Sequence, residues 1–330
     1  MSNIMDKILI NNYTKDIDFD FLLSQWKIQY QNNRPDIYIA GSPERTSFRI
    51  VIEDDKKSFY ILENLLKNSF DHKQNIINTL DQLKTHNVIH IQPYLKSITN
   101  EHLIEYKNSY WQLIPFISGI PLNRPHYIMD SWRGIKIAEF LIDLRNKTEP
   151  LSFSKMFRNF SLKSYVMNMI RLMKIHNPRE YIQLEPIIHF IKNDFFKIYE
   201  SLPHCFCHGD YHPLNIIWSD DNIKSVIDWE FLGMKPEIYD IANMLGCIGI
   251  EEPTGLFQGL TLTFIEEIKK SNFITDISFK YLFDCILTLR FGWLAEWFRK
   301  NDIDMINLEI NYMHLLLKNR DIIKRKWNLI

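Results

Sequence analysis

The sequence lacks an excess of charge of either sign. Of its 330 residues, 39 are Lys or Arg and 40 are Asp or Glu, which gives a formal net charge of −1. Proteins that bind nucleic acids gather basic side chains to neutralise phosphates. The charge balance therefore argues against a nucleic-acid partner.

The sequence also lacks the marks of secreted and membrane proteins. Its four cysteines are too few for a disulfide framework, and its first residues show no signal-peptide pattern. No apolar run approaches the roughly 18 residues that a membrane-spanning helix needs. We expect a cytoplasmic chain without membrane contact, whose 46% hydrophobic residues form a large core, divided between two lobes.

Two acidic positions and one amide stand out in the second half of the chain. The sequence reads His-Gly-Asp-Tyr-His-Pro-Leu-Asn over residues 208–215 and Val-Ile-Asp-Trp-Glu over residues 226–230. Phosphoryl transfer needs one carboxylate that accepts or orients the proton of an attacking hydroxyl, and separate oxygen ligands for Mg²⁺. Asp210 suits the first task, and Asn215 and Asp228 suit the second.

A hairpin between these residues would bring the two metal ligands together. Residues 216–218 and 224–227 are short β-prone runs, and residues 219–222 are a cluster of turn formers. We therefore expect Asn215, before the first strand, to lie beside Asp228, after the second.

A third motif makes the pattern specific. Tyr-Asp-Ile-Ala follows at residues 239–242. Together, the three motifs resemble the aminoglycoside phosphotransferase and choline kinase superfamily over residues 204–247. The resemblance implies an α+β, protein-kinase-like fold with two lobes. A small antiparallel-sheet lobe, residues 1–114, would bind nucleotide, and a large, mainly helical lobe, residues 115–330, would carry catalysis and acceptor binding.

The resemblance also implies roles for single residues. Asp210 corresponds to the catalytic Asp, Asn215 and Asp228 to the metal ligands, and Asp240, with His208, to the support of the catalytic loop. The implied enzyme transfers the terminal phosphoryl group of ATP to a hydroxyl of a small sugar, amino sugar or amino alcohol, with Mg²⁺. A non-catalytic nucleotide-binding or regulatory protein is the alternative, and the acceptor, the preferred nucleotide and the oligomeric state stay open.

A zinc site is a competing interpretation of the same region. His204, Cys205, Cys207, His208 and His212 lie close together in the sequence. However, a strand points both thiols of Cys-x-Cys to one side, and no second ligand pair follows at finger spacing. The pattern favours cysteines that face the core of a strand leading into the loop.

The N-terminal part alternates like a small sheet. Residues 36–40, 47–53, 58–63 and 109–116 are predicted strands, and residues 64–86 a helix.

Nucleotide contacts are expected at two places in this lobe. Gly41, Ser42 and Arg45 lie in the loop that corresponds to the family's nucleotide cover. Ile114 and Phe116 lie at the hinge, where the family offers backbone groups to adenine.

One expected ion pair is missing from the sequence. Kinases carry a Lys on the third strand that is paired with a helix Glu. Here Glu63 takes that position, and no Glu occurs between residues 64 and 89. The replacement cation could come from any of four side chains. They are Arg45, Arg49, Lys57 and Lys67.

The remaining C-terminal sequence is predicted to be helical, and one stretch is a candidate acceptor site. Trp293 and Trp297 are four residues apart and share a helix face with Arg290, while Glu296 lies at its edge. The resemblance implies that C-terminal helices line the acceptor pocket, and an indole face can hold a cation. An aromatic stripe of this spacing is otherwise typical of a helix core.

Overall fold

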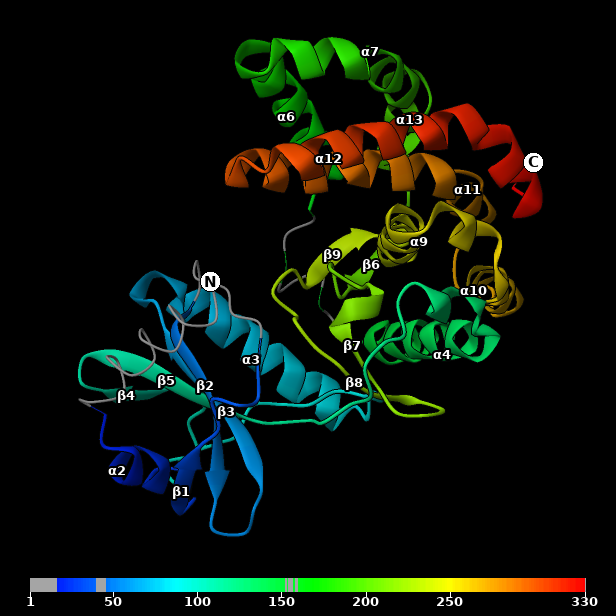
Figure 1. Ribbon diagram of the computed structural model, residues 1–330. Coiled ribbons are helices and arrows are strands. Elements are labelled where there is room, and N and C mark those ends of the chain that lie inside the picture. The colour runs from blue at the N-terminus through cyan, green and yellow to red at the C-terminus, as the bar shows by residue number, and fades with distance from the viewer. Residues whose placement is uncertain (1–16, 40–45, 152, 154–156, 158–159, 330) are drawn as a thin grey trace. The chain divides into compact units, whose positions relative to one another are not determined.

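The computed structural model describes residues 17–39, 46–151, 153, 157 and 160–329. The chain forms two compact units, Met1–Gly119 with Lys224–Val226, and Ile120–Ile223 with Ile227–Ile330. A small antiparallel sheet and a mainly helical remainder make the fold α+β, as predicted (Figure 1).

The first unit is built on one antiparallel sheet with the strand order β1-β2-β3-β5-β4. The strands are β1 (Tyr30–Asn33), β2 (Thr46–Asp54), β3 (Phe59–Leu65), β4 (Ile104–Tyr106) and β5 (Ser109–Pro115). Ile50, Leu62 and Leu113 are register partners across three strands and belong to a core shared with helix α2 (Phe19–Ser24). Because side chains alternate along a strand, the next row points to the opposite face.

Helix α3 (Phe70–Thr85) follows β3 through the short turn η1 (Lys67–Ser69). Ile76, Ile77, Leu80 and Leu83 form the buried stripe that the sequence predicts for this helix. Ile77 packs with Leu65 at the end of β3.

The prediction of a first strand at residues 36–40 is wrong. Strand β1 lies earlier, and the chain turns after it, where Nε and Nη2 of Arg34 donate to the Asp36 carboxylate at 2.8 and 2.7 Å. Tyr38 is 80% exposed, and residue 40 lies outside the described part. The β-prone residues here thus lack the partner strand that a ladder needs.

The hairpin of β4 and β5 was not predicted from the sequence. Lys107 and Asn108 both adopt positive φ values, 51° and 57°, between the paired strands. Two left-handed residues make the tight turn that matches strand twist. Only Asn108 signals it, and β4 has three residues, too few for a visible alternation.

The second unit contains most of the helices. They are α4 (Ser131–Thr148), α6 (Leu162–His176), α7 (Pro178–Asn193), α8 (Phe195–Ile198), α9 (Tyr239–Glu251), α10 (Gly259–Lys270), α11 (Asp276–Lys280), α12 (Leu282–Lys300) and α13 (Ile303–Lys326). Helix α12 packs against α13, α9 and α6 (Figure 1). Short 3-10 turns connect these elements. They are η2 (His126–Met129), η3 (Tyr199–Ser201), η4 (Pro213–Asn215) and η5 (Pro253–Phe257).

Four short strands lie between α8 and α9, and the last three residues of the third of them, Lys224–Val226, belong to the first unit. They are β6 (His204–Cys207), β7 (Ile216–Trp218), β8 (Ile223–Val226) and β9 (Gly233–Pro236). β6 pairs with β9 in antiparallel fashion, and β7 pairs with β8 as the predicted hairpin. Its turn is closed by the Ser219 amide, which donates to the Asn222 carbonyl at 2.8 Å.

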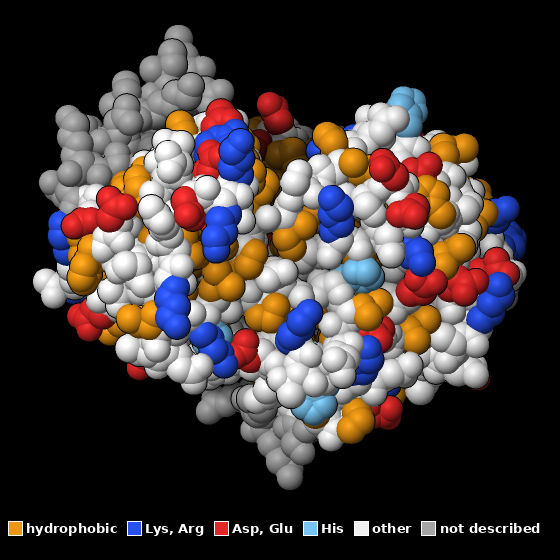
Figure 2. Space-filling view, turned by 90° about the horizontal axis from the view of Figure 1, so that it is seen from below, with side chains coloured by type: hydrophobic (Ala, Val, Ile, Leu, Met, Phe, Trp, Pro, Cys, Tyr) orange, Lys and Arg blue, Asp and Glu red, His pale blue; other side chains and the backbone are white. Residues whose placement is uncertain are grey.

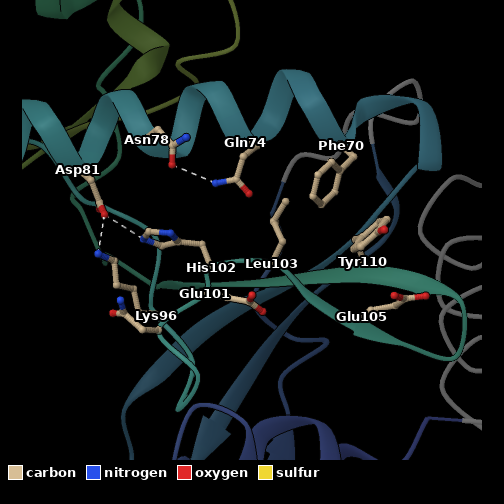
Figure 3. A pocket seen from close by; sticks show the side chains of 11 residues that line it. Phe70, Gln74, Asn78, Asp81, Lys96, Glu101, His102, Leu103, Glu105 and Tyr110 are labelled. Carbon is tan, nitrogen blue, oxygen red and sulfur yellow. Dashed lines mark hydrogen bonds and ion pairs between the residues drawn. The ribbon is translucent and has the colours of Figure 1, made fainter.

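The first unit also contains a polar pocket of about 460 Å³ between α3 and the segment leading through β4 to β5 (Figure 3). At one end, the Asp81 carboxylate lies 3.0 Å from Lys96 Nζ and 3.2 Å from His102 Nε2. At the other, the Phe70 and Tyr110 rings lie 4.4 Å apart. Asp81 therefore ties the segment before β4 to α3.

Charged side chains of both signs are interspersed on the face seen in Figure 2. Within the described ranges, no helix combines the length and the apolar character needed to cross a membrane.

Helices α4 and α10 approach each other at backbone distance. A Cβ atom on Gly134 of α4 would lie 2.3 Å from the Leu260 carbonyl oxygen and 2.9 Å from the Phe264 nitrogen. Backbone cannot yield as a side chain can, so this crossing requires glycine.

We therefore expect Gly134→Ala to lower the free energy of unfolding by about 1–3 kcal/mol through overpacking. Gly292→Ala is the matched control, because a Cβ on that α12 glycine would meet only Tyr165, at 4.0 Å. It should raise stability by about 0.5–1 kcal/mol, since alanine loses less backbone entropy in a helix. Urea unfolding of both variants checks this, and equal effects of the two substitutions would contradict the close crossing.

Candidate active site

Strand β6 delivers the chain into the site loop. Cys205 and Cys207 are buried, with their sulfur atoms 3.7 Å apart, because alternate residues of a strand share a face. Within the described part of the chain, no three His, Cys, Asp or Glu side chains are grouped to hold a metal. The two thiols belong to the core of this unit.

Gly209 makes the turn after β6. Its φ is 86°, a conformation that glycine adopts readily and other residues adopt only with strain. A Cβ atom at this position would also lie 2.0 Å from the Phe231 carbonyl oxygen. The turn directs the next residue, Asp210, away from the strand. A glycine is therefore required at this point of the His-Gly-Asp sequence.

Asp240, in the first turn of α9, holds this loop. Its carboxylate is 4% exposed and accepts the amide of His208 at 2.7 Å and the amide of Gly209 at 2.9 Å. Burial raises the pKa of Asp240 to about 6, while the two amide donors and Lys235 act in the opposite direction. At neutral pH the carboxylate is therefore ionised and can accept both bonds.

His208 is fully buried beneath the loop. One ring nitrogen, Nε2, lies 3.0 Å from the Ile227 carbonyl, and the other, Nδ1, lies 3.1 Å from the Asp210 amide. A carbonyl can only accept and an amide can only donate, so His208 is neutral with its proton on Nε2. Burial lowers the pKa of His208 to about 4, against attraction by Asp210 and the bond to Ile227.

The Asp210 carboxylate has side-chain donors at both oxygens. Oδ2 accepts from Asn215 Nδ2 at 3.2 Å and lies 3.7 Å from His212 Nε2, while Oδ1 accepts from Asn243 at 3.4 Å. Burial acts to raise the pKa of Asp210, but the hydrogen bond and charge of His212, with His208 and Asn215, hold it below its usual value. The group is an ionised acceptor with 19% of its side chain exposed.

Asn215 lies at the end of η4, and its amide orientation follows from its partners. Its NH₂ group donates to the Asp210 carbonyl at 2.9 Å and to the Asp210 carboxylate, both of which are acceptors. The amide oxygen is therefore directed away from Asp210. The Ile227 amide donates to the Asn215 carbonyl at 2.9 Å, which brings the chain just before Asp228 against Asn215.

Asp228 follows the hairpin in a left-handed conformation, with φ of 63°. Such a backbone is uncommon outside glycine, although Asp and Asn tolerate it best. Its side chain is exposed. An amide oxygen and a carboxylate are hard ligands that fit Mg²⁺, which keeps water and phosphate oxygens for its other positions.

The four residues predicted to bind the acceptor lie on α12, in different surroundings. The Arg290 side chain is 2% exposed and forms two bonds with Glu309 of α13, at 2.5 and 2.6 Å. Arg290 is therefore paired inside the helical unit, and its role in acceptor binding stays a prediction. Glu296 pairs with Arg299 and Lys300 on its own helix, and these bonds lower its pKa to about 2.

The two tryptophans are half-buried and stack on each other, with ring centroids 6.1 Å apart. The Trp293 ring also lies 5.9 Å from that of His212. Its indole nitrogen donates to Asn243 at 3.2 Å, whereas that of Trp297 donates to Glu309 at 3.4 Å. Trp293 is thus connected to Asp210 through a single residue, Asn243. Asn243 was not predicted, although its position three residues after Asp240 on α9 could have indicated it.

The predicted nucleotide contacts belong to the first unit. Gly41, Ser42 and Arg45 lie outside the described residues. Ile114 of β5 pairs with Ile61, and the Phe116 amide donates to the Phe59 carbonyl at 2.9 Å. Their roles stay predictions.

At the position of the missing lysine, the structure shows a polar row across three strands. Glu63 is 5% exposed, forms an ion pair with Arg49, whose Nε lies 2.7 Å from Oε1, and accepts a hydrogen bond from the side-chain amide of Gln112. Of the candidate cations, Arg45 lies outside the described residues, and Arg49 is placed at Glu63. In the following helix, α3, Lys73 is buried and lies 3.4 Å from the Tyr94 hydroxyl.

The sequence profile described as "Phosphotransferase enzyme family" matches residues 46–262. No curated protein sequence matches the chain.

Several solved structures share the fold. One is an aminoglycoside phosphotransferase from Alicyclobacillus acidocaldarius subsp. acidocaldarius DSM 446, 14% identical, with 92% of this chain and 95% of that chain covered and a TM-score of 0.65. A second is a spectinomycin phosphotransferase in complex with ADP and spectinomycin, which is 13% identical. The match covers 94% of this chain and 97% of that chain, with a TM-score of 0.64. A third is the GDP complex of an aminoglycoside 2'-phosphotransferase, which is 13% identical. The match covers 97% of this chain and 100% of that chain, with a TM-score of 0.65.

The environment of His208 predicts a loss of stability in acid. The unfolded chain binds a proton on this histidine near pH 6.5, the folded chain only near pH 4. Stability from this group is therefore fully present above pH 6.5 and is lost as pH falls toward 4. Between pH 7 and 5 the loss should be about 2 kcal/mol.

His208→Gln removes this titration and keeps a side-chain N–H donor. Unfolding by urea in EDTA at pH 7 and pH 5 should show a less stable variant at pH 7 that loses less than the wild type on acidification. Asp240 titrates in both proteins, so its contribution cancels in the comparison. An identical pH dependence of the two proteins would refute the neutral buried imidazole.

Proposed function

The chain belongs to the phosphotransferase enzyme family, and we propose that it transfers the terminal phosphoryl group of ATP or GTP to a hydroxyl of a small sugar, amino sugar or amino alcohol. In this reaction Asp210 acts as the catalytic base. The predicted family and kinase-like fold are confirmed by the profile match and by the solved structures. The chain is a phosphotransferase with an alcohol group as acceptor. Donor, acceptor and residue roles are the proposal.

The observation that carries the proposal is the arrangement of Asp210 on its loop. An ionised, partly exposed carboxylate is held by hydrogen bonds from Asn215 and Asn243, next to the chain that leads to Asp228. A carboxylate of this kind can accept a proton from a hydroxyl, and its fixed plane selects one direction of approach.

The reaction exchanges one P–O bond for another and transfers one proton. The acceptor oxygen bonds to the terminal phosphorus, the bond from that phosphorus to the diphosphate oxygen breaks, and the hydroxyl proton passes to Asp210. Asn215 would contribute its amide oxygen, and Asp228 its carboxylate, to hold a divalent ion. Mg²⁺, when bound, supplies positive charge that offsets the charge on the transferring phosphates.

Arg49 is the proposed substitute for the strand lysine. Its Nε lies 2.7 Å from Glu63 Oε1, and 29% of its side chain is exposed. Donor phosphates are the natural acceptors of a guanidinium fork. The relatives solved with ADP and with GDP support testing both ATP and GTP as donors.

A panel of four acceptors tests the proposed function. Spectinomycin, glucosamine, glucose and ethanolamine represent aminocyclitol, amino sugar, sugar and amino alcohol. Phosphorylated product should be detected by mass spectrometry for at least one compound, with ATP or GTP and Mg²⁺. Product formation that persists undiminished in Asp210→Asn would sink the proposed mechanism.

Asp210→Asn should lower kcat by about 10²–10⁴-fold, because an amide cannot take the hydroxyl proton. The Kd for nucleotide should change little, since Asp210 is assigned to the acceptor. Stopped-flow product formation and nucleotide titration measure the two effects separately. A thermal melt confirms that the near-isosteric variant is folded.

Asp228→Ala should abolish the dependence of nucleotide binding on Mg²⁺, because one of two protein ligands is lost. Isothermal titration with ATP, with Mg²⁺ and with EDTA, measures this dependence. Asp220→Ala, in the exposed turn of the same hairpin, is the control and should bind like the wild type. Equal Mg²⁺ dependence in both variants would contradict the assignment of Asp228.

A further inference from the structure

Asn243 links the site loop to α12. It is 5% exposed and lies one turn after Asp240 on α9, so both side chains face the loop. Its NH₂ group donates to Asp210 Oδ1 at 3.4 Å and to the Tyr211 carbonyl at 3.3 Å, and its oxygen accepts from Trp293 at 3.2 Å.

The orientation of this amide depends on Trp293. An indole N–H only donates, so it is satisfied only by the amide oxygen of Asn243. If the amide turned over, its oxygen would face the Asp210 carboxylate and the Tyr211 carbonyl, and its NH₂ would face the indole N–H. Trp293 thus selects the orientation that offers a donor to Asp210.

The indole of Trp293 is itself held on several sides. The His212 ring meets it at 73°, Trp297 stacks on it at 29°, and the Arg290 guanidinium carbon lies 5.6 Å from its centre. Arg290 is fixed in turn by Glu309. The buried ion pair between α12 and α13 therefore limits the movement of the indole N–H.

We propose that Asn243 and Trp293 are positioning residues that fix the plane of the Asp210 carboxylate, with Asn243 serving Oδ1 and Asn215 serving Oδ2. The inference rests on the proposed role of Asp210 as base. It gives Trp293 a task apart from acceptor binding, since the task needs its N–H group and not its ring face.

A double-mutant cycle tests the chain of bonds. Trp293→Phe keeps a ring and removes the N–H; it should lower kcat about 5-fold, roughly the effect of one neutral hydrogen bond, and leave the nucleotide KM unchanged. Asn243→Ala should lower kcat further. In the double variant, Trp293→Phe should add nothing, because its effect acts through Asn243.

Trp327→Phe is the matched control. The buried indole of Trp327 donates to the Leu256 carbonyl at 2.9 Å, so this variant also loses a buried indole bond. It should lower the melting temperature and leave kcat unchanged. The kinetic arm uses the panel compound that the wild type phosphorylates fastest.

A spectroscopic arm needs no acceptor. The indole ¹H–¹⁵N signal of Trp293 is identified by its loss in Trp293→Phe. It should move in Asn243→Ala, which removes the acceptor of its N–H, and in Asp210→Asn, which changes the partner of the Asn243 NH₂ group. An unmoved signal in Asp210→Asn, or additive losses of kcat in the cycle, would overturn the inference and leave the kinase proposal standing. A moving signal without product from any acceptor would support the bonded chain and count against the proposed function.

Discussion

The site depends on one interaction, the buried Asp240 carboxylate that accepts the amides of His208 and Gly209. Two backbone donors on a sharp turn would otherwise lie buried without partners, at a cost of about 1–3 kcal/mol each. Because Asp240 belongs to α9, its two hydrogen bonds fix the loop to this helix. The position of Asp210 follows from this, since it comes directly after the held amides.

A second layer of support comes from α12 and α13. The bidentate pair of Arg290 and Glu309 is buried, and removing one partner of such a pair typically costs about 3–5 kcal/mol. It holds the two tryptophans in place, and Trp293 reaches the loop through Asn243. Arg290 and Trp293, which the sequence suggests for acceptor binding, thus also support the surroundings of Asp210.

The misplaced strand and the surroundings of Arg290 both have physical causes. Residues 36–40 have the composition of a strand, but Arg34 and Asp36 close a turn there, and composition does not specify a partner strand. Arg290 has the spacing of a ligand contact, yet Glu309, 19 residues away, encloses it. Spacing along one helix shows which residues share a face, and it cannot show what covers that face.

The sequence alone determined the family, the α+β class and the group of Asp210, Asn215, Asp228 and Asp240. These depend on short spacings, a glycine turn and a local hairpin, whose geometry is set within a few residues. Only the tertiary structure decided that Arg49 accompanies Glu63, that His208 is neutral and that Asn243 joins Trp293 to the loop. Each of these contacts joins residues from different elements that only packing brings together. The local sequence around either residue does not indicate such a contact.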